Sequence, residues 1–423
     1  MSRAAVVAGI DVGSSKVCAV IGEAQREGRL HLIGVGVAPS KGIRRGVVVN
    51  IEQAVESIAA AVEKAERASG YKIVGALVTV SGGHVASQHN RGVVAVSHAD
   101  RIIREEDVQR ALESARVISL PSDRQIIHVV PRAFVVDGQD GVFNPAGMVG
   151  YRLDVETHIV TGGTTAIQNL AQCLRRAGVE VEGIVFEPLA TATVVLNEEE
   201  KEMGVALVDI GGGTTSIAAF TEGSVCHTNV LGLGGGHVTN DIAVGLRTPL
   251  GSAEELKLSH GHALPAAVAG EETVRVATFG GDGEEVSRRS LCEIMEARLE
   301  ELFALVGADL GRAGLGGILP AGLVLTGGTA DTPGIDELAR AVCRLPVRIG
   351  RPRGVTGLGE IVRGPAYAAA VGLLRWGSQG GAGLSGATGL PTGRPGRRGE
   401  EQRPRTMAAY GRVLTWLRSF LPQ

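Results

Sequence analysis

The sequence contains few aromatic residues and few cysteines, and both shortages restrict the functions open to it. Phe, Trp and Tyr make up only 3% of the 423 residues, so the chain lacks the aromatic platforms on which nucleic-acid modules stack bases. The net charge of −3 also argues against a general binder of polyanions. The five cysteines lie far apart without a C-x-x-C pair, which excludes a zinc ribbon and a disulfide framework and is typical of a reducing cytosol. Nucleic acid is therefore not expected among the partners.

Long apolar runs and several common catalytic motifs are also missing. No apolar run reaches 18 residues, and the apolar residues at 4–10 stop at Asp11. The sequence thus predicts neither a membrane-spanning helix nor a signal peptide, and the body is expected to be soluble and intracellular. The chain contains no G-x-x-x-x-G-K-[ST], no strand–G-x-G-x-x-G–helix unit, no H-E-x-x-H and no G-x-S-x-G. P-loop, dinucleotide-binding, metal-hydrolase and serine-hydrolase functions therefore have no support.

Glycine, by contrast, is abundant, and it interrupts a strand pattern that occurs twice. The chain has 62 glycines, about twice the usual share near 7%. The predicted strands of the two meanders are 6–12, 16–22 and 30–38, and then, about 200 residues later, 205–210, 216–220 and 224–230. Such a repeat predicts a duplicated α/β body with a cleft between two lobes.

Each meander begins with an Asp at the end of an apolar strand, followed by a turn of small residues. The first reads Asp11-x-Gly13-Ser14-Ser15, and the second reads Asp209-x-Gly211-Gly212-Gly213-Thr214-Thr215. Backbone N–H groups and hydroxyls in such turns donate hydrogen bonds to phosphate oxygens, and two carboxylates can hold the water shell of Mg²⁺. Either turn alone is also consistent with an ordinary tight hairpin. Because both occupy corresponding positions in similar halves, we interpret them as a phosphate site.

Three further patterns suit a nucleoside beside that phosphate site. A strand at 323–326 leads into Gly327-Gly328-Thr329, and Gly234-Gly235-Gly236 opens a predicted helix that runs through Asn240. A glycine turn at the start of a helix is a ready anion site. Glu254 and Lys257 share one face of a predicted helix, where they suit ribose hydroxyls and a base, although an i,i+3 ion pair is also common on solvated surfaces.

The two glycine turns, Gly327-Gly328 and the segment GPAYAAA at 364–370 look like the actin/DnaK/sugar-kinase ATPase superfamily. More specific segments are GIDVGSSK at 9–16, KGIRRGV at 41–47, IIHVVP at 126–131, HIVTG at 158–162, EPLA at 187–190 and LGGGH at 233–237. Together they resemble the FtsA family of bacterial cell-division proteins within that superfamily. The resemblance implies an α/β protein with a duplicated actin-like (ribonuclease-H-like) bilobed ATPase fold. The expected divisions are 1–82 and 163–196 for subdomain IA, 83–162 for an inserted α+β subdomain IC, 197–247 and 319–375 for IIA, and 248–318 for IIB.

The resemblance also implies a role for each matching residue. ATP is the expected ligand, Asp11 and Asp209 are expected to hold Mg²⁺ through water, and Glu187 is expected near the attacking water. Hydrolysis is expected to be slow at most, so that ATP acts mainly as a structural and polymerisation ligand. The expected ATP-binding residues are Gly13, Ser14, Ser15, Lys16, Gly212, Gly213, Thr214, Thr215, Gly235, Gly236, Asn240, Glu254, Lys257, Gly327 and Gly328. Among them, Lys16 is typical of the family's turn but has no assigned contact.

The C-terminal region differs from the rest of the chain. Residues 376–406 are rich in Gly and small polar residues, and we predict a disordered linker there because they cannot bury enough apolar surface to fold. Residues 407–423 contain a predicted amphipathic helix roughly 22 Å long, which is too short for a hydrocarbon core of about 30 Å and therefore suits the membrane interface. The residues expected at the membrane are Arg412, Val413, Leu414, Trp416, Leu417, Arg418, Phe420 and Leu421. The alternative is a helix docked on the body or on a partner.

The partners implied by the resemblance complete the hypothesis. The C-terminal peptide of FtsZ is expected to dock on a helix at 290–306, with Arg298 and Glu301 as contacts, although these two also suit a solvated ion pair. Other division proteins, an anionic membrane surface and further copies of the chain, stacked as a filament, are also expected partners. The expected location is the cytoplasmic face of the cell membrane at the division septum. A kinase or phosphatase of the same superfamily and an actin-like pilus-assembly platform stay open as alternatives.

Overall fold

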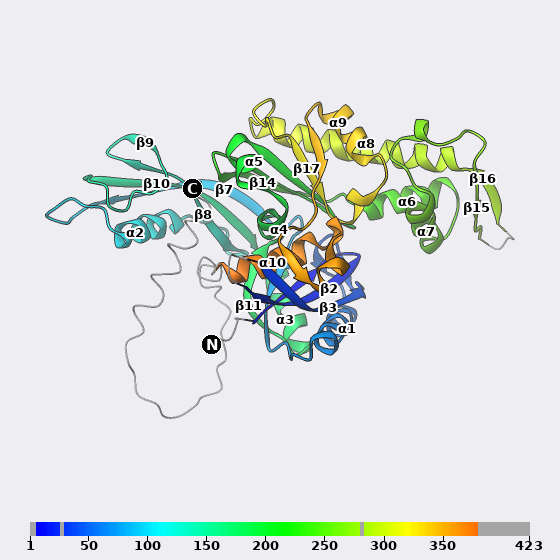
Figure 1. Cartoon of the computed structure of the whole chain (residues 1–423), viewed down its shortest axis with the longest axis horizontal. Helices are drawn as coiled ribbons and strands as arrows, with labels where there is room; N and C mark the ends of the chain where they lie inside the picture. Colours follow the sequence, from blue (N-terminus) through cyan, green and yellow to red (C-terminus); the bar gives the residue numbers. More distant parts are fainter. Residues whose placement is uncertain (1–5, 26–28, 280–282, 380–423) are drawn as a thin grey trace.

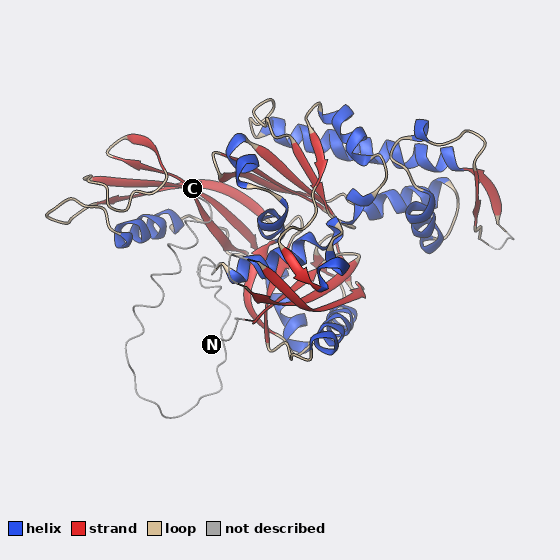
Figure 2. Ribbon diagram, in the orientation of Figure 1, coloured by secondary structure: helices blue, strands red, loops and turns tan. Residues whose placement is uncertain are grey.

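The structure is a computed structural model that describes residues 6–25, 29–279 and 283–379. Two central sheets lie one above the other in Figure 1, and a smaller part of the chain extends from each side of them. Figure 2 shows that strands dominate the extension on the left, whereas helices dominate the one on the right. The molecule is therefore a four-part α/β protein.

The first central sheet contains the first predicted meander. The strand order is β11-β6-β1-β2-β3-β19. The strands are β1 (Val6–Val12), β2 (Lys16–Ala24), β3 (Leu30–Pro39), β6 (Gly75–Val80), β11 (Glu180–Phe186) and β19 (Val355–Gly357). The pairs β1–β2 and β2–β3 are antiparallel, whereas β6 pairs in parallel with β1 and with β11.

Helices α1 (Ile51–Ser69) and α3 (Thr164–Arg176) pack on this sheet. The apolar face of α1 has helical spacing, with Ala54, Ile58 and Ala65 fully buried. The Asn50 side chain accepts a hydrogen bond from the Gln53 N–H at 3.0 Å and so caps the helix start. The helix ends at Gly70, where φ of 73° favours glycine.

The second central sheet repeats the topology of the first. Its order is β14-β13-β12-β17-β18, with antiparallel β12–β13 and β13–β14 pairs and parallel β12–β17 and β17–β18 pairs. Its strands are β12 (Val205–Ile210), β13 (Thr215–Thr221), β14 (Ser224–Leu231), β17 (Leu323–Thr326) and β18 (Val347–Ile349), and the nearby short helices are α5 (Glu198–Met203) and α9 (Ile335–Cys343). The predicted duplication is therefore confirmed.

The extension on the left of Figure 1 is a sheet of order β7-β10-β8-β9 that carries one helix. Its elements are β7 (Ala86–Ala95), α2 (Glu105–Arg116), β8 (Arg124–Val136), β9 (Gln139–Val142) and β10 (Arg152–Gly163). Val108, Ala111 and Leu153 are buried in a core of its own. An independent core on an α+β unit inserted between β6 and β11 agrees with the predicted insertion.

The extension on the right of Figure 1 consists of helices and a two-stranded sheet. Its elements are α6 (Gly235–Gly245), α7 (Leu250–His260), the short 3₁₀ helix η2 (Pro265–Ala267), β15 (Thr273–Val276), β16 (Glu284–Ser287) and α8 (Arg288–Arg312). Leu291, Met295 and Phe303 of α8 are buried in the same core as Val208 and Ile210 of the second sheet. Because the two parts share one core, this extension is anchored firmly on the second sheet.

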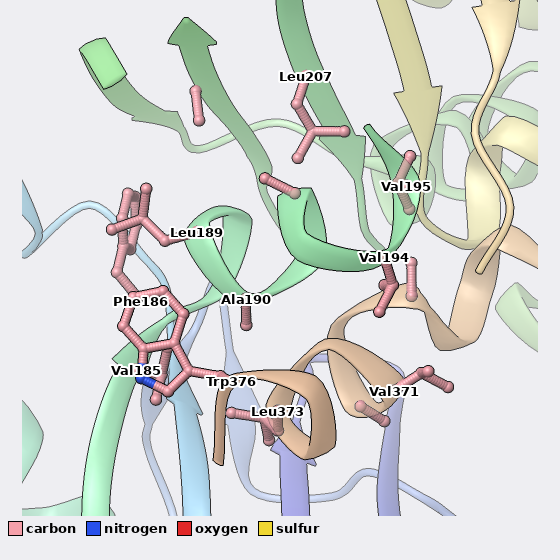
Figure 3. Close-up of a cluster of buried hydrophobic side chains, with 14 of the residues drawn as sticks. Val185, Phe186, Leu189, Ala190, Val194, Val195, Leu207, Val371, Leu373 and Trp376 are labelled. Atoms are coloured by element: carbon pink, nitrogen blue, oxygen red, sulfur yellow. The ribbon is translucent and has the colours of Figure 1, made fainter. Parts of the chain in front are cut away.

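Two helices in the middle connect the central sheets (Figure 3). Helix α4 (Glu187–Val195) and helix α10 (Ala368–Ser378) lie against each other, with Leu189 and Val194 of α4 and Leu373 and Trp376 of α10 in one apolar cluster. The remaining short elements are β4 (Ile43–Arg44), β5 (Val47–Val48), η3 (Gly328–Asp331), η4 (Leu358–Val362) and η5 (Pro365–Tyr367).

This central packing changes two predicted boundaries. Strand β19 pairs in parallel with β3 and α10 packs on β1, so the end of the segment 319–375 lies on the first sheet, although we expected all of it with the second lobe. Helix α10 also continues to Ser378 and buries Trp376, whereas the linker was predicted to begin at 376. Strand β19 has only three residues, so its pattern does not show which sheet it joins. Helix α10 continues past 376 because Trp376 is buried in its apolar face.

The close contact of α4 and α10 depends on a glycine. A Cβ atom at Gly372 would lie 2.3 Å from the Ala190 carbonyl oxygen, so Gly372→Ala must push α10 away from α4. We expect a loss of about 1–3 kcal/mol in the free energy of unfolding, as for other overpacked cores. Gly307→Ala in α8 is the matched control because a Cβ there meets nothing within 4 Å, and we expect it to be neutral or to stabilise by up to about 1 kcal/mol. Urea unfolding followed by circular dichroism measures both, and equal stabilities of the two variants would contradict the packing described.

Among the described residues, no helix combines the length and apolar character needed to cross a membrane. The predicted amphipathic helix at 407–423 and all of the linker beyond Gln379 lie outside the described residues. The membrane contacts predicted in that helix therefore stay predictions.

Candidate functional site

A cleft of about 780 Å³ lies between the two central sheets, and both glycine turns line it. Its volume falls within the usual range of about 300–1,000 Å³ for small-molecule sites. The predicted ligand-binding residues that line the cleft are Asp11, Gly13, Ser14, Ser15, Lys16, Glu187, Asp209, Gly212, Gly213, Thr214, Gly235, Gly236, Asn240, Glu254, Lys257, Gly327 and Gly328. The structure therefore brings together nearly all of the residues singled out from distant parts of the sequence.

Thr215 is the exception, and its placement differs from our prediction. It is fully buried at the start of β13 and its hydroxyl donates a hydrogen bond to the Leu233 carbonyl at 2.8 Å. Successive side chains of a strand point to opposite faces, so the Thr215 side chain points away from the cleft that Thr214 lines. Thr215 thus stabilises the turn from the side opposite the cleft.

The two turns touch each other at the centre of the cleft. A Cβ atom at Gly212 would lie 2.8 Å from Ser15 Cβ, and one at Gly213 would lie 2.7 Å from Ser14 Oγ. The start of α6 is held on the second turn by hydrogen bonds from Gly235 N–H to the Gly211 carbonyl at 2.9 Å and from Gly236 N–H to the Gly212 carbonyl at 2.7 Å. Glycine is required here because any side chain would fill the space between the turns.

Three carboxyl groups lie at the ends of β1, β11 and β12. The Thr79 hydroxyl donates a hydrogen bond to Asp11 Oδ1 at 2.7 Å, while Glu187 and Asp209 are buried. Burial, reinforced by the neighbouring Asp209 carboxylate, raises the pKa of Glu187 well above its usual range. Burial also raises the pKa of Asp209 and, against the hydrogen bond from Thr79, the pKa of Asp11. Three acids so close together favour a bound cation or proton.

The far end of the cleft combines polar and apolar groups. Lys257 Nζ lies 2.7 Å from Glu254 Oε2 and donates to the Thr239 hydroxyl at 2.9 Å. The predicted ion pair therefore exists and lines the cleft. Leu250 and Leu258 lie beside it with exposed side chains. Their place in the cleft was not predicted, because isolated leucines in a helix usually mark its buried face.

The lysine of the first turn makes two contacts with the segment before α10. Lys16 Nζ donates a hydrogen bond to the Ala366 carbonyl and lies 4.3 Å from the centroid of the Tyr367 ring, a favourable cation–π distance. Lys16 thus ties the first turn to the segment before α10. Thr79, Arg45 and His237 also line or support the cleft and were not singled out as site residues, because their partners lie far away in sequence.

The residues predicted to bind a partner peptide are already engaged with neighbours. Arg298 Nε lies 2.5 Å from Asp241 Oδ2 and its Nη2 lies 3.0 Å from Asp241 Oδ1, while its Nη1 donates to Glu301. The predicted Arg298–Glu301 pair is therefore present on α8. Asp241 of α6 was missed because periodicity does not show which helix packs against α8.

Comparison with known proteins identifies two matching family models and close relatives. The model described as "Cell division protein FtsA" matches residues 206–372, and the model described as "SHS2 domain inserted in FTSA" matches residues 82–161. The chain is 45% identical over 375 residues to the cell division protein FtsA of Pseudomonas aeruginosa, covering 88% of this chain and 89% of that protein.

Two solved structures share the fold at low sequence identity. The PilM–PilN type IV pilus biogenesis complex matches with a TM-score of 0.64 and 17% identity, covering 88% of this chain and 98% of the other. MreB5 of Spiroplasma citri bound to ADP matches with a TM-score of 0.52 and 14% identity, covering 88% and 95%. The predicted actin-like fold with an inserted subdomain is thereby confirmed, and the sequence relatives favour cell division over the kinase and pilus alternatives.

Proposed function

This chain belongs to the FtsA family of cell-division proteins, and we propose that it is an ATP-dependent adaptor that polymerises on the inner face of the cytoplasmic membrane at the septum and tethers FtsZ there. The observation that carries the proposal is the cleft in which two glycine turns meet beside three buried or half-buried carboxyl groups. Such a site suits a phosphorylated ligand, because small residues leave backbone N–H groups accessible to phosphate oxygens.

The geometry supports ATP and Mg²⁺ as the ligands. The space between the turns is one that a Cβ atom would fill, and Gly327, with φ of 85°, approaches so closely that its Cβ would lie 2.4 Å from Asp209 Oδ1. Two carboxylates, with waters and phosphate oxygens, are a typical Mg²⁺ environment. Bound Mg²⁺ would neutralise phosphate charge beside Asp11 and Asp209.

Glu187 is the proposed residue beside the attacking water. It is the first residue of α4, and its Oε1 accepts a hydrogen bond from the Thr191 hydroxyl at 3.2 Å. That contact fixes the carboxyl group at the base of the cleft. Burial and the neighbouring Asp209 carboxylate raise the pKa of Glu187, and a raised pKa makes the ionised carboxylate a stronger proton acceptor. The proposed hydrolysis is slow at most, with ATP acting mainly as a structural and polymerisation ligand.

The proposed FtsZ contact lies on the outer part of α8. We place the FtsZ C-terminal peptide across Arg298 and Glu301, where an acidic group of the peptide competes with Asp241 for the guanidinium. Arg298 is only 28% exposed, whereas Glu301 is 52% exposed, so Glu301 presents the larger accessible surface.

This peptide contact can be tested with two arginines of the same helix. We expect Arg298→Gln to weaken binding of a labelled FtsZ C-terminal peptide by about 10-fold, because a charge-assisted hydrogen bond is lost. Arg289→Gln is the matched control, since Arg289 lies near the start of α8 and pairs only loosely with Glu293 at 3.8 Å. Fluorescence anisotropy measures the affinities, and thermal unfolding checks that both variants fold. Equal affinities for wild type and Arg298→Gln would contradict the placement on α8.

A further inference from the structure

A short hairpin of the first lobe reaches the mouth of the cleft. Strands β4 and β5 pair through Ile43–Val48 and Arg44–Val47, so Arg45 and Gly46 form the turn. Arg44, Arg45 and Gly46 all line the cleft. The resemblance of segment 41–47 to the family implies no role for Arg44 or Arg45.

The backbone of the hairpin turn fits tightly between both glycine turns. Gly46 N–H donates to Ser14 Oγ at 3.0 Å, and a Cβ atom at Gly213 would lie 3.1 Å from Arg45 N. Arg45 itself has φ of 49°, a left-handed conformation that costs free energy in a residue with a side chain and persists only where the surroundings hold it. The turn is therefore held at the point where the two phosphate turns meet.

The Arg45 side chain crosses from the first lobe to the second. Its Nη2 lies 3.2 Å from Nε2 of His237, the third residue of α6. His237 Nδ1 lies 3.1 Å from the Gly234 backbone N and 3.3 Å from the Gly234 carbonyl oxygen. Because a guanidinium can only donate, its contact with Nε2 requires the tautomer with the proton on Nδ1, which then faces the Gly234 carbonyl. Arg45 and His237 thus bridge the mouth of the cleft, as the Ser81 and Ser216 hydroxyls do at 2.8 Å elsewhere between the lobes.

The charge of Arg45 is available to a ligand. Lys257 is paired with Glu254, and Lys16 is bound to the Ala366 carbonyl. In the part of the chain that the structure describes, no carboxylate forms an ion pair with Arg45, whose partner His237 is an uncharged acceptor in the arrangement above. The guanidinium donates one N–H to His237, and its remaining N–H groups can donate hydrogen bonds to a ligand.

The location of the hairpin determines which part of a ligand it meets. Gly46 packs against Ser81, where a Cβ atom at Gly46 would lie 2.2 Å from the Ser81 carbonyl oxygen. Ser81 follows β6 and lies two residues after Thr79. The Thr79 hydroxyl donates the hydrogen bond to Asp11 described above. The hairpin is therefore fixed at the carboxylate end of the cleft, while Glu254 and Lys257 lie on α7. A nucleotide with its base at α7 presents its last phosphate to the hairpin.

We propose that Arg45 is the specificity-determining residue that distinguishes a nucleoside triphosphate from a diphosphate in this cleft, and that His237 positions it. The proposal rests on the proposed ATP site. Arg45 donates hydrogen bonds to the terminal phosphate, and because His237 belongs to α6, this contact links the phosphate to closure of the second lobe onto the first. A diphosphate leaves Arg45 bound to His237 alone.

The test compares two nucleotides on the full-length chain. Isothermal titration calorimetry with Mg²⁺ measures the affinities for ADP and for AMP-PNP, a non-hydrolysable ATP analogue. We expect Arg45→Ala to weaken AMP-PNP binding by about 10- to 100-fold, as for loss of a charge-assisted contact, and ADP binding by less than about 3-fold. Arg67→Ala removes the same charge from α1, where Arg67 pairs with Glu63 and does not line the cleft, and we expect it to change the ratio of the two affinities by less than about 3-fold.

Variants of His237 separate positioning from general structural support. We expect His237→Ala to lower the preference for AMP-PNP by about 3- to 10-fold, His237→Gln to restore it because the amide oxygen accepts from Arg45, and Arg45→Ala/His237→Ala to be no worse than Arg45→Ala. Equal losses for both nucleotides, or equal effects of Arg67→Ala and Arg45→Ala, would overturn the proposal while leaving the ATP site intact. Failure of the wild-type chain to bind either nucleotide would instead refute the proposed function itself.

Discussion

Gly213→Val is expected to weaken ATP binding by about 100-fold or more while the protein stays folded. Gly213 lies where the two glycine turns meet, and its added Cβ would be 2.7 Å from Ser14 Oγ and 2.8 Å from Ser14 Cβ. Overpacking at this position costs about 1–3 kcal/mol and would disturb the contact between the two turns that forms the phosphate site. The valine methyl groups would also cover the backbone N–H groups of the turn. Gly213 is not among the described residues with positive φ, so the backbone itself tolerates a side chain.

The control for this variant lies in the same lobe. Gly232→Val adds the same side chain at a position where a Cβ meets nothing within 4 Å, and we expect its ATP affinity to equal that of wild type. Calorimetry with Mg²⁺ and with EDTA measures both affinities, and the proposed role of Asp11 and Asp209 predicts tighter binding with Mg²⁺. Circular dichroism reports the folded state. ATP binding by Gly213→Val within about 3-fold of wild type would mean that phosphate does not bind between the turns.

The glycine turns could be predicted from sequence because their signal is local. Each turn directly follows a buried strand, and the strand pattern places Asp11 and Asp209 at equivalent positions of the two sheets. The Glu254–Lys257 pair was predictable for the same reason, since both residues lie on one helix. The topology of the two meanders, and hence the duplication, follows from these short-range patterns.

Contacts between distant segments could not be predicted in this way. The hydrogen bond from Thr79 to Asp11 joins residues 68 apart, and the contact of Arg45 with His237 joins residues 192 apart. Asp241 meets Arg298 because α6 and α8 pack together. Thr215 was assigned to the ligand site because the motif ends there, although the alternation of β13 turns it inward. Tertiary packing decides each of these, and no periodicity in the sequence encodes it.

The helix predicted at 407–423 would make the proposed membrane binding dependent on assembly of the chain. Six large apolar side chains contribute about 9 kcal/mol when buried, whereas ordering the helix costs about 1 kcal/mol per residue. One such helix is thus a marginal anchor, although nearby arginines add about 1 kcal/mol each on anionic lipid. A filament that presents many helices at once would bind firmly through multivalency. Membrane binding should therefore require ATP as well as the helix.

Co-sedimentation with anionic liposomes tests this central claim most directly. The full-length chain, a variant truncated after residue 406, and full-length Gly213→Val are each mixed with liposomes and a labelled FtsZ C-terminal peptide, with and without Mg-ATP. We expect only the full-length wild type with Mg-ATP to sediment strongly and to carry the peptide into the pellet. The truncated variant should still bind ATP, which shows that it folds. Equal sedimentation of the full-length and truncated chains, or failure of the full-length chain to sediment with Mg-ATP, would contradict a nucleotide-dependent membrane adaptor.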